Sequence, residues 1–179
     1  GWIADRVLGP QRSVWYGGIV IALGHFTLAI PRQDTFFVGL VMVALGSGLL
    51  KTSMSTLVGM LYPEGGARRD AGFSLFYMGV NLGAFLGPFV CSWLGEKVDW
   101  HLGFAAAGVG MLLGLFQYRI TRHRLGDCGL LPHYSTHPAR DRVMLGVGFS
   151  TIIGIALLAL SGAVAVHPEA LAQHTKWLI

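Results

Sequence analysis

Five apolar runs, separated by short polar segments, dominate the pattern of hydrophobic and polar positions along this 179-residue chain. They cover residues 14–30, 35–61, 71–95, 102–118 and 143–166. A helix that crosses a bilayer needs roughly 20 apolar residues, or about 30 Å at 1.5 Å per residue. The pattern therefore predicts five membrane-spanning helices and an all-α, polytopic membrane protein.

The composition agrees with this interpretation. Only 12% of the residues are charged and the mean hydropathy is +0.58, whereas soluble domains carry roughly 25% charged residues. The charges lie between the apolar runs, so the net charge of +4 concerns membrane topology, and we expect no nucleic-acid partner. Cys91 in an apolar run and Cys128 in a polar loop offer no disulfide framework.

Basic residues are distributed unequally between the two sides of the predicted membrane. One set of segments is rich in arginine, and the opposite set holds only Arg32, Lys97 and Lys176. By the positive-inside rule the arginine-rich segments face the cytoplasm, and the alternation fits all five runs. We therefore expect a multi-pass protein of the cell's inner (cytoplasmic) membrane. The cytoplasmic arginines are Arg6, Arg12, Arg68, Arg69, Arg119, Arg122, Arg124, Arg140 and Arg142.

Lys51 is the one charged residue inside an apolar run, and it lies about ten residues, or roughly 15 Å, from the predicted cytoplasmic end of that run. A lysine at such depth costs roughly 2.5–3.5 kcal/mol on insertion scales, so intramembrane lysines are usually functional and paired. None of the five runs contains Asp or Glu. Its partner is therefore expected to be a carboxylate on another helix, an anionic ligand group or water. The alternative is a snorkelling lysine whose amine reaches the interface.

Polar and small residues accompany Lys51. Ser47 and Ser55 lie one turn to either side of it, which predicts a polar stripe facing a cavity. In the next run, Asn81 lies at a depth of roughly 16 Å from the expected helix start near Asp70, a residue placed to cap that helix. Asn81 and Lys51 are therefore predicted to face one cavity at one level, with Tyr77 one turn nearer the cytoplasm. Asn81 alone is equally compatible with an interhelical hydrogen bond.

Three other features have simpler explanations. Gly79, Gly83 and Gly87 repeat at a spacing of four, which predicts a helix-packing seam. The loop 123–137 contains histidines, Asp127 and Cys128, but its spacing lacks a paired Cys-x2-Cys, so we expect a solvated linker and no metal site or other cofactor. No run carries a nucleophile–base or metal arrangement, so we expect no enzyme.

Taken in order, the motifs of residues 1–118 resemble the proton-dependent oligopeptide transporter (POT) family of the major facilitator superfamily. GWIADRVLG resembles the loop between helices 2 and 3, and the segment ending in ALGHF resembles helix 3. ALGSGLLKTSMSTLVGMLYPE resembles helix 4 with its lysine, and WHLGFAAAGVGMLLGL resembles helix 6. The segment RRDAGFSLFYMGVNLGAFLGP resembles helix 5 with the signature Phe-Tyr-x-x-(Ile/Val)-Asn-x-Gly, which here is Phe76, Tyr77, Val80, Asn81 and Gly83.

The resemblance implies a fragment of an N-terminal bundle and a domain organisation. Residues 1–118 would supply loop 2–3 and helices 3–6, residues 119–142 a cytoplasmic linker, and residues 143–179 an inserted membrane helix with the start of its hairpin partner. The implied function is import of di- and tripeptides driven by inward proton flow through alternating access. The implied partners are short peptides, protons, membrane lipid and the missing helices of the full-length chain.

The resemblance also implies residue roles. Lys51 would act in proton coupling and bind the peptide carboxylate, Asn81 would recognise the peptide backbone near its amino end, and Asp5 and Arg6, with Arg12 nearby, would belong to a cytoplasmic gate. The chain departs from the family at Pro10-Gln11-Arg12, where a basic run is more usual, and it lacks the helix with Glu-x-x-Glu-Arg. Carriage of nitrate or another small anion on the same fold, or a non-transporting membrane receptor, are the alternatives.

Overall fold

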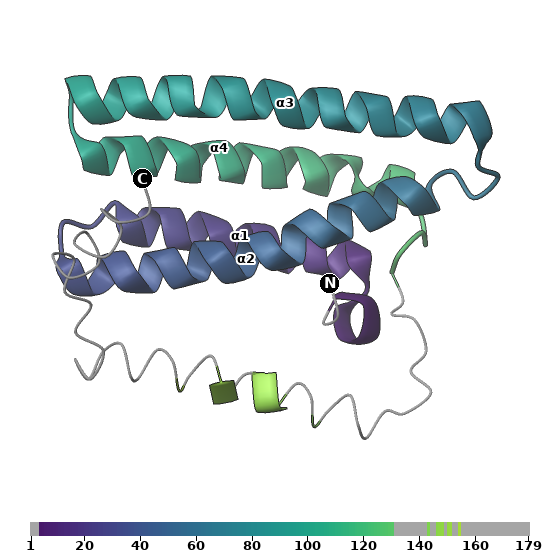
Figure 1. Cartoon of the computed structure of the whole chain (residues 1–179), viewed down its shortest axis with the longest axis horizontal. Helices are drawn as coiled ribbons and strands as arrows, with labels where there is room; N and C mark the ends of the chain where they lie inside the picture. The colour runs from purple at the N-terminus through teal and green to yellow at the C-terminus, as the bar shows by residue number, and fades with distance from the viewer. Residues whose placement is uncertain (1–3, 131–142, 144–145, 149, 152–153, 155–179) are drawn as a thin grey trace, which may run out of the picture. The chain divides into compact units, whose positions relative to one another are not determined.

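The computed structural model describes residues 4–130 and, beyond them, residues 143, 146–148, 150, 151 and 154 (Figure 1). The chain divides into two compact units, Gly1–Tyr134 and Ser135–Ile179. The helices described below all belong to the first unit. Residues 131–142 of the predicted linker 119–142, and almost all of the predicted fifth membrane run, lie outside the described residues.

Every regular element that the structure describes in the first unit is helical. A π-helical turn, Ala4–Leu8, precedes α1 (Pro10–Leu28), α2 (Gln33–Met60), α3 (Gly66–Lys97) and α4 (Trp100–Thr121), and a 3₁₀ turn, Arg122–Leu125, follows. The four long helices occupy the first four predicted runs. By length and composition α2, α3 and the stretch Trp100–Leu125 are suited to cross a membrane. The predicted all-α architecture is confirmed.

The helices begin earlier than the apolar runs do. Pro10 stands at the first position of α1, where its missing N–H costs nothing. The helix α3 begins at Gly66, with Gly65 at its N-cap, so Asp70 lies one turn inside the helix and the prediction that it caps the helix is wrong. At the start of α4 the carboxylate of Asp99 accepts a hydrogen bond of 2.7 Å from the His101 N–H. Polar residues thus extend the helices beyond the apolar segments.

The α1–α2 contact forms along facing glycines. A Cβ built at Gly46 would lie 2.7 Å from the carbonyl oxygen of Gly17, and one built at Gly39 would lie 2.8 Å from that of Gly24. Within each helix the two glycines are seven residues apart, which places them on one face. Small residues on one face let helix backbones approach closely in lipid. These four buried glycines therefore form the seam between α1 and α2.

The other contacts arrange α4 beside α1 and α3. Leu115 of α4 fills the space at Gly18, and Phe26 of α1 does the same at Gly108. At the far end of α4, a Cβ at Gly103 would lie 2.7 Å from the Cys91 carbonyl oxygen of α3. The buried apolar core consists of Val14, Ile21, Ala22, Leu28, Leu57 and Leu115. It therefore lies mostly along α1, with single contributions from α2 and α4.

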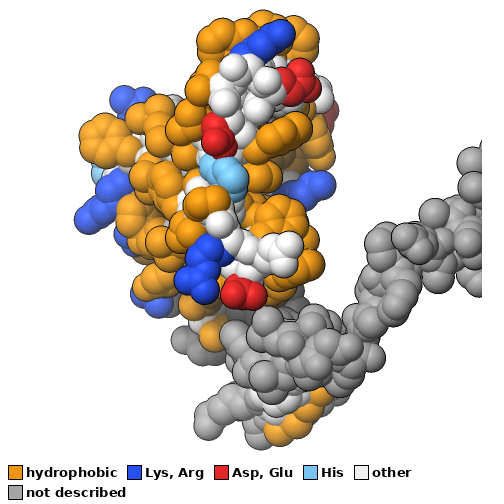
Figure 2. All heavy atoms as spheres, turned by 90° about the vertical axis from the view of Figure 1, so that its left-hand side faces the viewer, with side chains coloured by type: hydrophobic (Ala, Val, Ile, Leu, Met, Phe, Trp, Pro, Cys, Tyr) orange, Lys and Arg blue, Asp and Glu red, His pale blue; other side chains and the backbone are white. Residues whose placement is uncertain are grey.

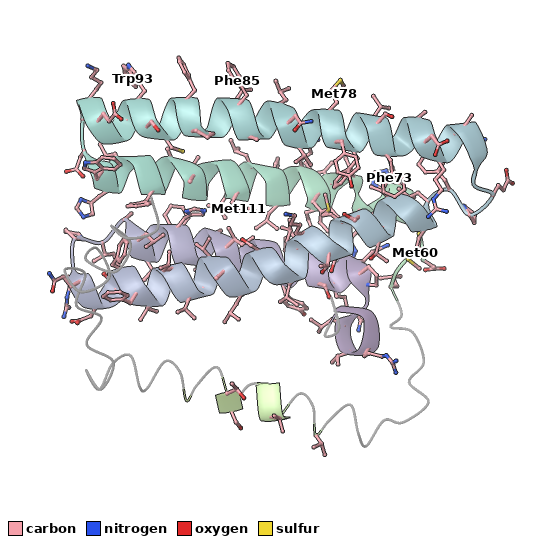
Figure 3. All side chains as sticks on the ribbon, viewed as in Figure 1. Met60, Phe73, Met78, Phe85, Trp93 and Met111 are labelled. Atoms are coloured by element: carbon pink, nitrogen blue, oxygen red, sulfur yellow. The ribbon has the colours of Figure 1, made fainter. Side chains whose placement is uncertain are left out.

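Among the described residues, the closest contacts of α3 with other helices lie near its two ends. It meets α4 near Gly95 and α2 near Phe73, and every residue from 77 to 90 is exposed. Figure 3 shows Met78, Phe85 and Trp93 on the α3 side that points away from the other helices. Among the described residues nothing lies within 4 Å of a Cβ built at Gly79, Gly83 or Gly87. The proposed packing seam at these glycines stays a prediction.

The two ends of the bundle differ in charge. The starts of α1 and α3 lie at the same end of the bundle as the C-terminal ends of α2 and α4. This follows from the contacts of Tyr118 with Gln11 and of Gly59 with Arg69. Figure 2 faces the opposite end, where basic, acidic and histidine side chains mix. Those residues are Arg32, Asp34, Glu96, Lys97, Asp99 and His101. The arginine-rich end carries Arg6, Arg12, Arg68, Arg69, Arg119, Arg122 and Arg124.

Candidate functional site

Lys51 lies on the side of α2 that faces away from α1. Gly39, Gly46 and Ser53 mark the buried face of α2, and at 100° per residue Lys51 is rotated from them by roughly 120–160°. The Lys51 side chain is exposed. In the described part of the chain the Lys51 ammonium group has neither an ion pair nor a hydrogen bond. The position leaves the ammonium group available to a partner outside these helices.

The hydroxyl groups around Lys51 are turned onto their own helix. Thr52 Oγ1 donates to the Gly48 carbonyl oxygen at 3.0 Å, and Thr56 Oγ1 donates to that of Thr52 at 3.0 Å. Ser55 Oγ donates to the Lys51 carbonyl oxygen at 3.4 Å. Each hydroxyl has a single proton, so these groups can still accept a hydrogen bond but have little to donate. Towards a ligand, these three hydroxyl groups are therefore better acceptors than donors.

The contact between α2 and α3 places Asn81 and Lys51 at a similar depth in the predicted membrane. A Cβ built at Gly59 would lie 3.8 Å from the Phe73 ring, so these two residues mark the same level on antiparallel helices. Lys51 is eight residues before Gly59 and Asn81 is eight residues after Phe73. Eight residues span about 12 Å in each helix. Lys51 and Asn81 therefore lie at similar depth, and Asn81 is exposed like Lys51.

Tyr77 lies one turn from Asn81, towards the contact between α2 and α3. Its ring stacks on Phe73 with centroids 6.4 Å apart and meets Phe76 edge-on at 5.4 Å. The guanidinium of Arg69 lies 5.8 Å from the Phe73 ring centroid. These aromatic contacts orient Tyr77 while leaving 55% of it exposed. A phenol held in this way can present its hydroxyl group to a ligand one helical turn from Asn81, towards the arginine-rich end.

The proposed gate residues lie at the arginine-rich end. Asp5 falls in the π-helical turn Ala4–Leu8, and its side chain is outside what the structure describes. Arg6 is exposed and interacts with a neighbour. Arg12 is exposed and lines a pocket with residues of α4. The structure thus places Arg12 beside α4, and the assignment of Asp5, Arg6 and Arg12 to a gate stays a prediction.

Gln11 is a structural centre that the sequence analysis did not identify. It is 1% exposed, and its Nε2 donates to the carbonyl oxygens of Gly126 at 3.0 Å and Cys128 at 2.7 Å. Its Oε1 accepts from Arg122 Nε at 3.2 Å. The Gln11 backbone N–H donates to Gly129 at 3.0 Å, and its carbonyl oxygen accepts from the Tyr118 hydroxyl at 3.0 Å. One residue thereby joins the start of α1 to the end of α4 and the segment after it.

Within the described residues no group of three or more His, Cys, Asp and Glu side chains could hold a metal ion. His123 Nδ1 lies 2.7 Å from the Ile120 carbonyl oxygen, which makes it part of the local turn. His133 and His137, the remaining histidines of loop 123–137, lie outside the described residues.

Comparison with known proteins gives one consistent answer. The model of the POT family matches residues 11–136. A transporter of Bacillus subtilis, described as uncharacterised, is 43% identical over 93% of this chain and 33% of its own length. A peptide transporter of Yersinia enterocolitica is 39% identical over the whole chain and 37% of its own length. A di-/tripeptide transporter of Lactococcus lactis is 44% identical over 69% of the chain and 25% of its own length.

Solved structures resemble the chain in the same way. A crystal structure of a peptide transporter in complex with sulfate matches with a TM-score of 0.80 and 44% identity, over 93% of this chain and 34% of the other. A POT family transporter in complex with a thioalcohol-conjugated peptide matches with a TM-score of 0.80 and 34% identity, over 97% and 37% respectively. The chain thus spans about a third of the length of these relatives.

Proposed function

We propose, because this chain belongs to the POT family, that it forms part of a transporter that carries di- and tripeptides across the membrane together with protons. The chain is a membrane protein with several candidate spans. We further propose that the membrane is the inner, cytoplasmic one and that the arginine-rich end faces the cytoplasm, since positive charge favours that side. The names of the Yersinia and Lactococcus relatives support a peptide substrate.

Lys51 carries this proposal. It is an exposed cation in an apolar helix, with no ion pair or hydrogen bond among the described residues. A zwitterionic peptide offers it a carboxylate, and a helix outside this chain would offer it another. In our proposal the ammonium group alternates between these two carboxylates. The protein carboxylate takes up a proton when Lys51 leaves it for the peptide, which links proton entry to peptide binding.

The polar groups near Lys51 fit the other end of the peptide. We propose that the Asn81 amide binds the peptide backbone near the amino terminus and that the Tyr77 hydroxyl contributes a further hydrogen bond. The hydroxyl groups of Thr52, Ser55 and Thr56 donate their hydrogen bonds to backbone carbonyl oxygens, so their oxygens can accept hydrogen bonds from the peptide's N–H groups. We also propose that Asp5, Arg6 and Arg12 form a cytoplasmic gate, and that Gly79, Gly83 and Gly87 pack against a helix outside this chain.

The domain assignment belongs to the same proposal. Residues 1–118 would supply part of the N-terminal bundle, residues 119–142 a cytoplasmic linker, and residues 143–179 an inserted helix and the start of its partner. Small-anion carriage is the second candidate, because a cation without a carboxylate partner attracts anions in general. Peptide-driven and nitrate-driven proton uptake by the same reconstituted protein distinguish the two functions.

The decisive experiment compares Lys51→Ala with Lys97→Ala in the whole transporter, reconstituted into vesicles with an imposed pH gradient. Lys97 is an exposed lysine at the end of α3 and serves as the matched control. Lys51→Ala should abolish gradient-driven dipeptide uptake at normal expression, whereas Lys97→Ala should keep it. Normal pH-dependent uptake by Lys51→Ala would refute the assignment.

A further inference from the structure

A second polar site lies at the arginine-rich end, away from Lys51. The start of α1 and the end of α4 enclose a pocket of about 340 Å³. Arg119 and Arg122 reach it from the α4 side, and Gln11, Arg12, Trp15 and Tyr16 line it from α1. Three arginines and two aromatic residues therefore line one pocket.

The pocket is a built site, because Gln11 fixes one of its walls. Gln11 is buried, and its side chain makes two hydrogen bonds to the carbonyl oxygens of Gly126 and Cys128. Its remaining Oε1 receives Arg122 Nε, which sets the plane of that guanidinium. An arginine that uses Nε in this way keeps its two terminal nitrogens for another acceptor. Arg122 thus presents donors in a defined direction, which a freely moving surface arginine does not.

The positive charge of this pocket is not neutralised within the described residues. Their ion pairs involve neither Arg12 nor Arg119 nor Arg122. Asp127 is the acidic residue nearest in sequence to Arg122, and it is exposed and forms no ion pair with the three. Arginines at this end also serve as topology signals, and exposed ones need no ligand. A topology signal requires neither a pocket nor an oriented guanidinium group, so these two features indicate a bound anion.

We propose that this pocket binds the phosphate group of an anionic phospholipid of the cytoplasmic leaflet. Arginine matches phosphate through paired, charge-assisted hydrogen bonds. Trp15 and Tyr16 stand beside the arginines, and such aromatic residues settle at the headgroup level of a bilayer. Basic pockets between membrane helices on this side are suited to lipid headgroups. The bilayer surface supplies phosphate groups at high local concentration, which favours a lipid over free phosphate.

The proposal rests on membrane insertion and not on peptide transport. Its test is therefore a binding measurement on the purified whole transporter, in which native mass spectrometry counts retained phosphatidylglycerol against phosphatidylcholine. The double variant Arg12→Gln/Arg119→Gln is compared with Arg68→Gln/Arg124→Gln, which removes the same charge from exposed positions of the same end. We expect the preference of the double variant for phosphatidylglycerol to be weaker by roughly tenfold or more, because each pocket arginine loses its charge-assisted hydrogen bonds to the phosphate group. The control pair should lose far less.

Two further measurements separate the remaining explanations. Arg12→Lys/Arg119→Lys should keep more of the preference than the glutamine pair, because lysine retains the charge, and less than the wild type, because it lacks the paired hydrogen bonds. This intermediate result would separate the loss of charge from misfolding. Inorganic phosphate at millimolar concentration should fail to displace the lipid. Equal losses in both glutamine pairs would overturn the proposal in favour of general surface attraction. Displacement by inorganic phosphate alone would overturn the lipid as the source of the phosphate group.

Discussion

Gly17 of α1 and Gly46 of α2 face each other so closely that a Cβ built on either would lie within 3.0 Å of the other's carbonyl oxygen. The contact is reciprocal and involves backbone, which has little room to move aside. We therefore predict that Gly46→Leu destabilises the protein by about 1–3 kcal/mol or more, as overpacking does. Thermal unfolding in detergent measures this.

Gly48 provides the control for that variant. It lies two residues away on the same helix, and the described residues leave nothing within 4 Å of a Cβ built there. Gly48→Leu should therefore leave the unfolding temperature much closer to that of the wild type. Equal destabilisation by the two variants would contradict the assignment of the α1–α2 seam to Gly17 and Gly46.

Gln11 offers a prediction about polar packing. Gln11→Ala removes its three side-chain hydrogen bonds and leaves two carbonyl oxygens without these donors. Each intramolecular hydrogen bond contributes about 0.5–1.5 kcal/mol net, so the loss of three should destabilise the fold by about 1.5–4.5 kcal/mol. Hydrogen exchange should rise at residues 126–130. Gln117→Ala, at an exposed position of α4, should change neither quantity appreciably.

Asn81 is predicted to contribute to peptide affinity. Asn81→Ala should raise the half-saturating peptide concentration while uptake remains proton-dependent, because the variant loses a ligand contact and keeps Lys51. Ser74→Ala is the matched control in the same helix, since the Ser74 hydroxyl is bonded to the Asp70 carbonyl oxygen. An unchanged half-saturating concentration in Asn81→Ala would instead favour the alternative that Asn81 makes an interhelical hydrogen bond.

Tyr77 allows packing to be separated from hydrogen bonding. Tyr77→Phe preserves the ring contacts to Phe73 and Phe76 and removes only the hydroxyl group. We expect a several-fold higher half-saturating concentration with unchanged thermal stability, since one neutral hydrogen bond contributes about 0.5–1.5 kcal/mol. Uptake kinetics and unfolding of the same preparation check this. A fall in stability without a change in affinity would show that Tyr77 acts in packing alone.

Asp99 at the start of α4 predicts a local pH dependence. Hydrogen bonds from the His101 backbone and side chain hold the Asp99 pKa below its ordinary value. A carboxylate with a lowered pKa stabilises the folded state above its unfolded pKa of about 4, and this stabilisation is lost as the pH falls through the folded value. Hydrogen exchange at the first turn of α4 should therefore increase in strong acid. Asp99→Asn, which keeps a capping side chain, should not show that increase.

The long apolar runs could be read from the sequence because bilayer thickness sets a strong requirement for length and apolarity. The helix ends could not, because residues 10–13 and 66–70 are polar or small and yet helical. The glycine pairs of α1 and α2 are seven residues apart, a spacing that also places glycines on one helix face. The predicted seam instead used the spacing of four at Gly79, Gly83 and Gly87. Those three meet no described neighbour.

The candidate site divides in the same way. Lys51 could be identified because a charge in an apolar helix is rare and costly. Its similar depth to Asn81 follows from the proximity of Gly59 and Phe73 on neighbouring helices, which no single-helix pattern contains. Gln11 could not be found, because its side-chain partners at Gly126, Cys128 and Arg122 lie more than 100 residues away in sequence. Long-range hydrogen bonding leaves no local signature at a glutamine that follows a proline.

The contacts of α3 near its two ends have a consequence for where a partner can bind. The helix α3 has one support beside Gly95 and another beside Phe73, with 77–90 unsupported between them by the described residues (Figure 1). The described contacts therefore hold α3 near both ends and leave residues 77–90 open to a partner. A partner that packs on residues 77–90 would therefore cover the part of α3 that carries Asn81 and leave the glycine contact between α1 and α2 untouched.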